Sequence, residues 1–380
     1  MSLSEAFLEA PEQPAPLTAD SPAPTDVLDR LDGLLTRVTE LDGSDLHLTA
    51  GIRPMVRLRG ELAPLTGWPM MTAADVETIA RGILTPAQWT LFEEEQELDF
   101  AHGVVGIGRF RVNFYRQRGS VGAAFRVIPR KILDLGSLGL PPVVSTLAQL
   151  QRGLVLVTGP TGSGKSTTLA SLLDLANRTR TGHILTIEDP IEYVHKHAGC
   201  IVNQREVGVD TSGFGVALKH ALRQDPDIIL VGELRDLETT AVAVTAAETG
   251  HLVLATLHTR SAATTVERLI DIFPPSQQQQ IRTQLSGCLE AVVAQALAPT
   301  ADGLGRTAIT EVMLATPAIR NLIREAKVHQ ITNAIQSSGE LGMITFDQHL
   351  AERVMEGKIT RATALGLAHQ PDEFRRLARL

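Results

Sequence analysis

Hydrophobic and polar positions recur with two different periods along this chain, and the changes of period mark its expected elements. A helical period begins near residue 25, where apolar side chains return every three or four positions. A period of two follows at Arg109–Tyr115, where Phe110, Val112 and Phe114 alternate with polar side chains and predict a strand. After a Gly-Ser turn, Val121–Ile128 is the expected return strand of a hairpin. The apolar face of the first helix consists of Val27, Leu28, Leu31, Leu34, Leu35 and Val38.

Shorter patterns around these elements complete a mixed domain. We expect an α+β domain over residues 26–130. Residues 1–25 contain five prolines and cannot bury a core, so they predict a disordered tail. The other predicted strands are Asp45–Leu48 and Met55–Leu58, and the other predicted helices are Ala73–Arg81 and Pro86–Glu95.

The second half of the chain has a different organisation. Residues 131–142 contain two prolines and two glycines and are expected to form a linker. Over residues 143–260 apolar runs alternate with helical patterns, which predicts a mostly parallel sheet with helices on both faces. The pattern is mainly helical from there to residue 380. The predicted fold class is therefore α/β, with a small α+β domain, a linker and a parallel-sheet domain over 143–380 that ends in a helical part.

One loop of the second domain carries a clear chemical signal. Gly159–Ser166 reads G-x-x-x-x-G-K-S, the phosphate-binding loop of nucleoside triphosphatases. It follows the apolar run Leu154–Val157 and precedes a helical pattern, the context that separates this motif from a chance match. Backbone N–H groups would surround the phosphates, Lys165 would reach the β- and γ-phosphates, and Ser166 would bind Mg²⁺. The predicted nucleotide-binding residues are Gly159, Pro160, Thr161, Gly162, Ser163, Gly164, Lys165, Ser166 and Thr167.

Acidic residues follow two further apolar runs. Glu188 and Asp189 end the first run, and Glu233 follows the second by way of Gly232. Because ligands bind at the carboxyl ends of strands in open α/β sheets, Glu188 and Glu233 are candidate catalytic and Mg²⁺-binding residues. The alternatives are a solvated Glu188 with Asp189 as the cap of the next turn, and a surface Glu233 that pairs with Arg235.

Two histidines bracket a third predicted strand. His251 precedes and His258 follows the run Leu252–Leu257. A histidine beside a phosphate site can sense the γ-phosphate or hold the attacking water, so both are candidate catalytic residues. The alternative is a structural role for each of them. Neither lies in an H-E-x-x-H zinc motif.

Composition and charge exclude or disfavour several classes of protein. The 380 residues carry a net charge of −8, which argues against a protein that coats nucleic acid. Cys200 and Cys288 form no C-x-x-C pair, so no structural zinc site is expected, and two reduced thiols are favoured over a disulfide. There is no signal-peptide pattern and no run of roughly 18 apolar residues. We expect a soluble cytoplasmic protein.

Taken together, the motifs resemble one family, the hexameric secretion ATPases that power type IV pili and type II secretion. The resemblance covers about residues 27–375. Gly232, where a generic ATPase has aspartate, is usual in this family. The matching segments are the phosphate loop, an Asp box at Thr186–Tyr193, a Walker B segment at Arg223–Glu233, a His box at Thr249–Thr259, and the amino-terminal segments Ser44–Leu48 and Gly108–Gln117.

Two features resemble the retraction branch of that family, which drives twitching motility. Assembly and secretion ATPases carry a four-cysteine zinc module, which two cysteines cannot form. Ala318–Glu325 reads AIRNLIRE, a motif of the retraction branch. From the residues alone, this segment is an amphipathic helix with Ile319, Leu322 and Ile323 on its apolar side.

The resemblance implies a PAS-like amino-terminal domain, a RecA-like ATPase domain and a homohexamer that couples hydrolysis of ATP with Mg²⁺ to pilus retraction. It also implies that arginines of the amino-terminal domain stabilise phosphate charge. Arg111 and Arg126 are the candidates, with surface ion pairs as the alternative role. The implied partners are an inner-membrane pilus platform protein and paralogous pilus ATPases, without direct nucleic acid. The implied location is the cytoplasm, peripheral to the inner face of the cytoplasmic membrane.

Three other functions stay open at this point. A pilus-extension or type II secretion ATPase would share the chemistry and differ in direction. A nucleotide-dependent accessory or regulatory subunit would not need hydrolysis, although Lys165, Ser166 and Glu233 count against it. A DNA translocase is disfavoured by the net charge of −8.

Overall fold

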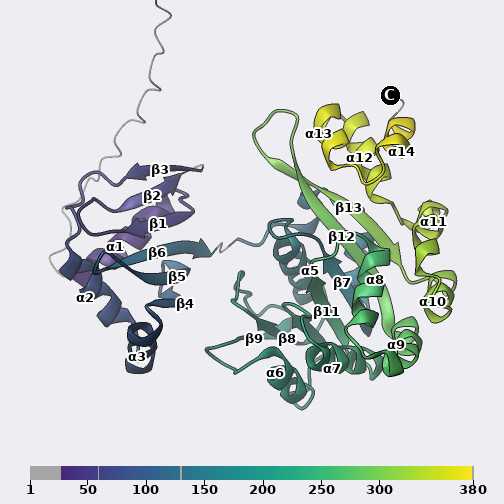
Figure 1. The fold of residues 1–380 in the computed structure, drawn as a ribbon, viewed down its shortest axis with the longest axis horizontal. Coiled ribbons are helices and arrows are strands. Elements are labelled where there is room, and N and C mark those ends of the chain that lie inside the picture. The colour runs from purple at the N-terminus through teal and green to yellow at the C-terminus, as the bar shows by residue number, and fades with distance from the viewer. Residues whose placement is uncertain (1–26, 59, 129–130, 379–380) are drawn as a thin grey trace, which may run out of the picture. The chain divides into compact units, whose positions relative to one another are not determined.

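The computed structural model describes residues 27–58, 60–128 and 131–378 (Figure 1). It consists of two compact units, Met1–Arg130 and Lys131–Leu380. The tail predicted over residues 1–25 lies outside the described residues. No helix in the described ranges has both the length and the apolar character that crossing a membrane requires.

The first unit is a six-stranded antiparallel sheet covered by helices on one face. Its strand order is β3-β2-β1-β6-β5-β4. The predicted hairpin is confirmed, because β5 and β6 pair from Arg109 opposite Ile128 to Gln117 opposite Ser120. The elements are α1 (Val27–Glu40), β1 (Asp45–Leu48), β2 (Met55–Leu58), β3 (Glu61–Pro64), α2 (Ala73–Ile83), α3 (Pro86–Glu95), β4 (Glu97–Val104), β5 (Gly108–Gln117) and β6 (Ser120–Ile128).

The core of this unit lies between the helices and one face of the sheet. Phe110, Val112 and Phe114 are fully buried, whereas Arg111 between them is exposed, so the predicted alternation is confirmed. Leu28, at the start of α1, is 38% exposed and lies at the margin of the core. The strands β3 and β4 were not predicted, because each buries few residues and therefore shows little alternation. The buried residues of α1 are Leu31, Leu34, Leu35 and Val38.

The second unit contains a seven-stranded sheet in the order β13-β12-β7-β11-β10-β8-β9. All neighbouring strands are parallel except β12 and β13, which form an antiparallel pair. The strands are β7 (Gly153–Thr158), β8 (Gly182–Glu188), β9 (Cys200–Glu206), β10 (Ile228–Val231), β11 (Leu252–Leu257), β12 (Leu289–Pro299) and β13 (Arg306–Leu314). The helices are η1 (Leu135–Leu138), α4 (Val143–Thr146), η2 (Leu147–Gln149), α5 (Lys165–Thr179), α6 (Phe214–Ala221), α7 (Leu237–Glu248), α8 (Ala262–Asp271), α9 (Pro275–Cys288), α10 (Pro317–Arg324), η3 (Val328–Gln330), α11 (Ile331–Gln336), η4 (Gly339–Leu341), α12 (Phe346–Met355), α13 (Arg361–Leu367) and α14 (Pro371–Leu377).

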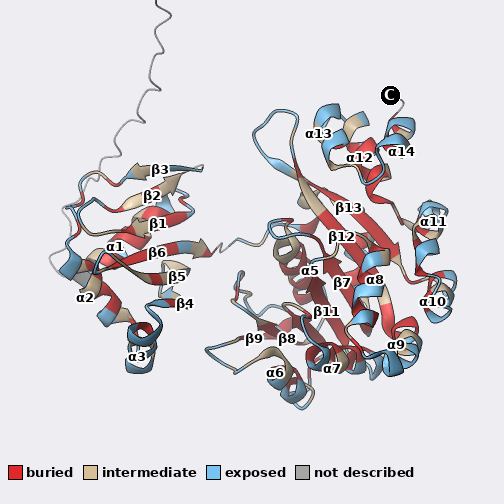
Figure 2. Cartoon of the chain, in the orientation of Figure 1, coloured by how far each residue is buried: buried red, intermediate tan, exposed pale blue. Residues whose placement is uncertain are grey.

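Both faces of this sheet are buried, as predicted. Leu154 and Leu156 of β7 pack in one core with α6 to α11, whereas Val155 and Val157 pack in the other with α5. Figure 2 shows the central strands as buried along most of their length. A smaller cluster joins α12, α13 and α14 to β12 and β13. The central strand β7 therefore ends in a loop that is held from both sides of the sheet.

The prediction of a mainly helical segment after residue 260 is wrong where β12 and β13 form a hairpin. The β12 segment Leu289–Pro299 is rich in alanine and leucine, which favour helices. It is also buried on both faces, so it lacks a period of two. Parallel pairing with β7 overrides that local preference, because β12 lies beside β7 on the side opposite to β11.

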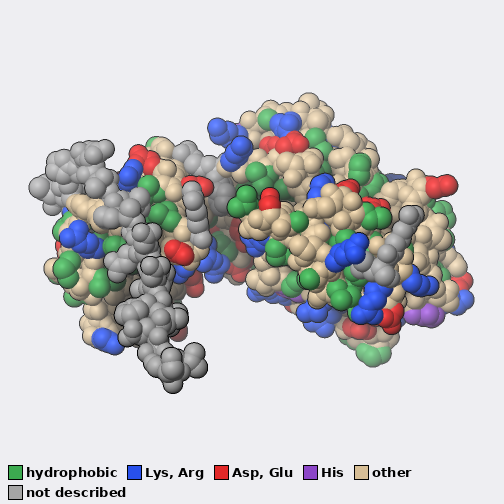
Figure 3. Space-filling view, turned by 90° about the horizontal axis from the view of Figure 1, so that it is seen from above, with side chains coloured by type: hydrophobic (Ala, Val, Ile, Leu, Met, Phe, Trp, Pro, Cys, Tyr) green, Lys and Arg blue, Asp and Glu red, His purple; other side chains and the backbone are tan. Residues whose placement is uncertain are grey.

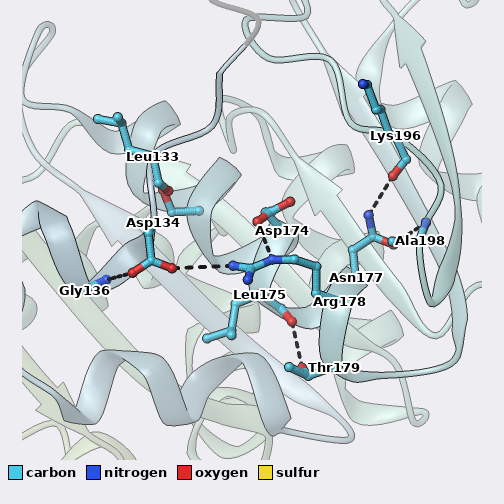
Figure 4. A network of polar contacts seen from close by, with 11 residues as sticks. Leu133, Asp134, Gly136, Asp174, Leu175, Asn177, Arg178, Thr179, Lys196 and Ala198 are labelled. Atoms are coloured by element: carbon cyan, nitrogen blue, oxygen red, sulfur yellow. Dashed lines mark hydrogen bonds and ion pairs between the residues drawn. The ribbon is translucent and has the colours of Figure 1, made fainter.

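Residues 131–142, predicted as a linker, lie within the second unit and pack on α5. The Ser171 hydroxyl donates to the carbonyl oxygen of Leu133 at 2.7 Å. The Arg178 guanidinium lies 3.5 Å from a carboxylate oxygen of Asp134 (Figure 4). The part of this segment that follows Leu133 is thus fastened to the helix that begins at Lys165.

Candidate nucleotide site

The loop between β7 and α5 has the shape of a phosphate cradle. Gly159, Gly162 and Gly164 have φ angles of 140°, 78° and 87°, which residues other than glycine rarely adopt. A Cβ atom on Gly159 would lie 2.2 Å from the carbonyl oxygen of Gln295. The motif's glycines are therefore required by the backbone and by the close approach of β12.

Lys165 lies in the first turn of α5 with its ammonium group directed back to the loop. Its Nζ donates to the carbonyl oxygens of Gly159 at 2.8 Å and Pro160 at 3.2 Å. Burial lowers the pKa of Lys165, and the carboxylates of Glu233 and Glu192 act against that effect. A cation and two carboxylates thus share the ends of β7, β8 and β10.

Glu233 is held between two cationic or polar partners after β10. One carboxylate oxygen lies 2.8 Å from Arg235 and the other 3.1 Å from Nε2 of His258. The preceding Gly232 accepts a hydrogen bond from the Thr256 hydroxyl at 2.5 Å. The predicted alternative pairing with Arg235 exists, but Glu233 is also close to Lys165 and is fixed in direction by His258.

Glu188 ends β8, and its carboxylate is partly buried. One carboxylate oxygen accepts from the Thr186 hydroxyl at 2.6 Å and from the Gln204 amide at 3.0 Å. Burial raises the pKa of Glu188, against the effect of these hydrogen bonds. The alternative of a solvated Glu188 is therefore wrong, and a cation bound nearby would favour its ionised form.

Tyr193 is a site residue that we did not predict. Its hydroxyl lies 2.8 Å from the hydroxyl of Thr167, and its carbonyl oxygen accepts from the Gln204 amide at 2.8 Å. These contacts fasten the segment after Glu188 to the start of α5. The available signal was the position of a tyrosine, of which the chain has two, in the Asp box.

The two histidines occupy opposite ends of β11. His258 follows the strand and contacts Glu233. His251 precedes it, at the edge where Leu252 pairs with Gly153, and its Nδ1 lies 3.1 Å from the carbonyl oxygen of Ala246. The phosphate loop is at the other edge, so within one chain the structure does not bring His251 to the predicted site.

Arg111 and Arg126 lie side by side on β5 and β6 of the first unit. Arg126 forms an ion pair with Asp45 at 2.8 Å, and Arg111 lies 3.9 Å from Asp99. The side chain of Arg126 is 69% exposed and that of Arg111 is 49% exposed. The Arg111–Asp99 pair is exposed on both sides and contributes little to stability, so Arg111 is free to exchange Asp99 for an anion. Asp45, the partner of Arg126, is buried, so this ion pair holds Arg126 more firmly.

A cavity of about 1000 Å³ adjoins the phosphate loop within the second unit. Gly164, Thr167 and Thr168 line one side, and residues of η1 and of the β12–β13 hairpin line the other. The lining combines apolar side chains such as Leu138 and Leu297 with hydroxyl groups. This is the composition expected where a base and a sugar extend from bound phosphates.

The donor set suits Mg²⁺ that is bound together with a nucleotide. No group of three or more His, Cys, Asp or Glu side chains that could hold a metal alone occurs in the part of the chain that the structure describes. Mg²⁺ is characteristically bound by one or two carboxylates, and water and substrate phosphate oxygens complete most of its shell. Ser166 at the start of α5 and the carboxylates of Glu188 and Glu233 fit that pattern.

The AIRNLIRE segment forms α10 with Ile319 and Ile323 buried. Arg320 does not point into solvent. Its guanidinium donates to the carbonyl oxygens of Ser286 at 3.1 Å and Gly287 at 3.0 Å, and to Glu290 at 2.9 Å. Arg320 thus satisfies the last turn of α9, where free carbonyl oxygens and the helix dipole favour a cation.

We expect Arg320→Ala to lower the free energy of unfolding by about 1.5–3 kcal/mol, because it removes charge-assisted hydrogen bonds to three acceptors. Differential scanning calorimetry should show a fall of roughly 2–4 °C in melting temperature for each kcal/mol. Arg324→Ala is the matched control, because Arg324 is exposed and its guanidinium donates to the neighbouring Asn321 at 3.2 Å. Equal destabilisation by both variants would contradict the capping role.

Comparison with known proteins agrees with this geometry. The family model described as "Type II/IV secretion system protein" matches residues 132–365. The type IV pilus retraction ATPase PilT of Pseudomonas aeruginosa is 51% identical over 341 residues, which cover 90% of this chain and 98% of the relative. The type IV pilus ATPase PilU of the same organism is 46% identical over 347 residues, 91% of each chain.

A solved structure extends the likeness to three dimensions. The crystal structure of the pilus retraction motor PilT with bound ADP has a TM-score of 0.85 and 47% identity, over 90% of this chain and 98% of that chain. Both domains of the present chain thus have counterparts in a related motor. The chain belongs to the family of type II/IV secretion system ATPases and is a PilT-like pilus retraction ATPase within it.

Proposed function

We propose that this ATPase binds MgATP at Gly159–Thr167 and hydrolyses it, as a homohexamer, to withdraw type IV pilus subunits during twitching motility. One observation carries the assignment of the site. Lys165, whose ammonium donates to the carbonyl oxygens of the phosphate loop, lies near Glu233, which His258 and Arg235 hold in place. A phosphate-binding cation and an oriented carboxylate therefore meet at the carboxyl ends of neighbouring strands.

Glu233 is the residue best suited to act on the attacking water. Its contact with His258 at 3.1 Å fixes the direction of one carboxylate oxygen, and the other is held by Arg235 at 2.8 Å. A carboxylate oriented in this way accepts the proton of a water molecule as that water attacks the γ-phosphate. Because His258 contacts a carboxylate oxygen of Glu233, it would respond when Glu233 takes up that proton, and it would transmit the response to β11.

Mg²⁺ supplies neutralisation of the charge on the β- and γ-phosphate oxygens when it is bound. We assign Ser166, Glu188 and Glu233 as the residues that hold it, directly or through water. Glu188 would do so as a carboxylate that Thr186 and Gln204 already orient. His251, at the far end of β11, is proposed only for a coupling role away from the phosphates.

The cavity beside the loop is proposed to receive the adenosine part of the nucleotide. The ADP named for the related retraction motor supports an adenine nucleotide at the equivalent site. The wall formed by η1 belongs to residues 131–142, which Ser171 and Arg178 of α5 hold. Nucleotide occupancy would therefore act on residues 131–142, through which hydrolysis would rotate one unit against the other.

We propose that Arg111 and Arg126 complete the site from the first unit, as suppliers of positive charge to the phosphates within the ring. The proposed partners are further copies of this chain, a pilus platform protein of the inner membrane and paralogous pilus ATPases. On the face of the second unit that Figure 3 shows, Lys and Arg side chains are interspersed with Asp and Glu side chains. The net charge of the chain is −8. We therefore propose protein partners without nucleic acid, at the cytoplasmic face of the inner membrane.

Complementation of a deletion strain tests this function. Loss of twitching together with more surface pili, restored by the wild-type gene but not by a Glu233→Ala gene, is the result expected of a retraction motor that needs hydrolysis. Loss of pili from the surface would instead indicate extension. Full rescue by Glu233→Ala would indicate an accessory subunit that does not need hydrolysis.

A further inference from the structure

Gln295 of β12 is a buried polar residue that no motif of the sequence includes. It is 3% exposed, in a strand that pairs in parallel with β7 and brings Ala294 opposite Thr158. Thr158 is the last residue before the phosphate loop. Gln295 therefore lies beside the loop although about 130 residues separate the two in the sequence.

Both ends of the Gln295 amide are bound to the loop and to the helix that follows it. Nε2 donates to the carbonyl oxygen of Ser163 at 2.6 Å. Oε1 accepts from the hydroxyl of Thr168 at 2.9 Å, and Thr168 is itself 2% exposed. One side chain thus spans the turn at which the loop becomes α5, with the donor on the loop side and the acceptor on the helix side.

The loop is also shaped around Gln295. The main-chain carbonyl oxygen of Gln295 occupies the space that a Cβ atom on Gly159 would enter. The side-chain Nε2 of Gln295 lies 3.0 Å from the position of a Cβ atom on Gly164. In a trans peptide the C=O and the N–H point in opposite directions, so holding the carbonyl oxygen of Ser163 also directs the N–H of Gly164 away from the Gln295 amide. N–H groups at the start of a helix such as α5 are the donors that a phosphate needs.

We propose that Gln295 is a positioning residue that keeps the phosphate loop in its nucleotide-binding shape. This inference rests on the proposed binding of nucleotide at Gly159–Thr167. Without the amide, Ser163 and Thr168 would turn to other partners and the loop would have to be reordered each time a nucleotide bound. The cost would appear mainly in nucleotide affinity and in KM, and much less in kcat, because Gln295 touches no reacting atom.

Gln295→Met tests the proposal, since methionine keeps the length of the side chain and removes both hydrogen bonds. We expect titration calorimetry with MgADP to show about tenfold weaker binding, from the loss of two buried hydrogen bonds. ATPase assays should show a similar rise in KM, with kcat within about threefold of the wild type. Gln295→Glu keeps the acceptor for Thr168 but places a carboxylate against the carbonyl oxygen of Ser163, so its affinity should be at least as low.

Asn177 provides the matched control. It is also a buried amide of the second unit, and it holds another loop. Its amide donates to the carbonyl oxygen of Lys196 at 2.7 Å (Figure 4) and accepts from the N–H of Cys200 at 3.1 Å. Asn177→Leu should lower the melting temperature without changing the affinity for MgADP. A purely structural amide at position 295 would give the same result, so unchanged affinity in Gln295→Met overturns the proposal.

A second variant keeps the proposal testable if Gln295→Met does not fold. Thr168→Val removes only the helix-side hydrogen bond, and Thr168→Ser restores it. The proposal is supported if Thr168→Val binds MgADP more weakly than the wild type and Thr168→Ser binds it like the wild type. Equal affinity in both variants would overturn the proposal. Wild-type protein that fails to bind MgADP would contradict the proposed nucleotide site itself, a result that is separate from either outcome for Gln295.

Discussion

Replacing Glu233 with glutamine is expected to leave nucleotide binding nearly intact and to lower the rate of ATP hydrolysis by about 10²–10⁴-fold, the range of a positioned general base. Glutamine has the size of glutamate, and its single amide oxygen can still accept from Arg235 while its NH2 group takes the position that faces His258. It cannot take a proton from water and it carries no charge for Mg²⁺. Phosphate release at saturating ATP, together with titration of MgADP, would separate turnover from binding.

Glu238→Gln is the control for the loss of one carboxylate in this region. Glu238 lies in the first turn of α7 and pairs with Lys219, and its side chain is 57% exposed. Its removal should change the hydrolysis rate by less than about twofold, because exposed ion pairs contribute little. If Glu233→Gln retains wild-type turnover, the general base must be sought elsewhere, and Glu188 is the next carboxylate at this edge of the sheet.

The phosphate loop could be predicted from the sequence because its geometry depends on residues that are adjacent in the chain. Glycines at 159, 162 and 164 supply the backbone angles, and the neighbouring strand and helix supply the context. Glu188 and Glu233 could be predicted because each ends an apolar run, and parallel strands bring their carboxyl ends to one edge. Local patterns and one rule of sheet topology were sufficient for these residues.

Gln295 could not be predicted, because its role comes from the position of β12 beside β7. The segment Leu289–Pro299 favours a helix by composition, and only pairing with a distant strand makes it extended. A buried glutamine in such a segment has no local signature. Tyr193 could not be predicted as a site residue for the same reason, because its hydroxyl contacts Thr167, which is 26 residues away in the sequence.

The assignment of His251 to the site within one chain failed for a different reason. Its position before β11, and that of His258 after it, were both visible in the sequence. In a parallel sheet the residue before a strand and the residue after it lie at opposite edges, and six residues of strand at about 3.3 Å each separate the two histidines by roughly 20 Å. Strand direction therefore excludes a shared site within one chain.

Removing the ammonium group of Lys165 is expected to weaken ATP binding by about 2–5 kcal/mol, the cost of breaking a buried, hydrogen-bonded charge pair. In the Lys165→Ala variant the carbonyl oxygens of Gly159 and Pro160 lose the donor that now binds both. The carboxylates of Glu233 and Glu192, which now act on the ammonium, would face the phosphates without it. The attraction between the ammonium and the phosphates is lost, and the repulsion between the carboxylates and the phosphates is no longer compensated. The loss of binding free energy therefore exceeds that of an ordinary hydrogen bond.

The loss is measurable as a change in ligand-induced stability. A ligand at 100 times its dissociation constant stabilises a folded protein by about 2.7 kcal/mol, so MgATP at that level should raise the melting temperature of the wild type clearly. The same MgATP concentration should leave Lys165→Ala almost unshifted, whereas Lys219→Ala, which removes a lysine with a 55% exposed side chain, should shift like the wild type. Glu233→Gln should also keep its shift. A full shift in Lys165→Ala would mean that phosphates bind away from Gly159–Thr167, and the roles assigned to Glu233 and Gln295 would then lose their common basis.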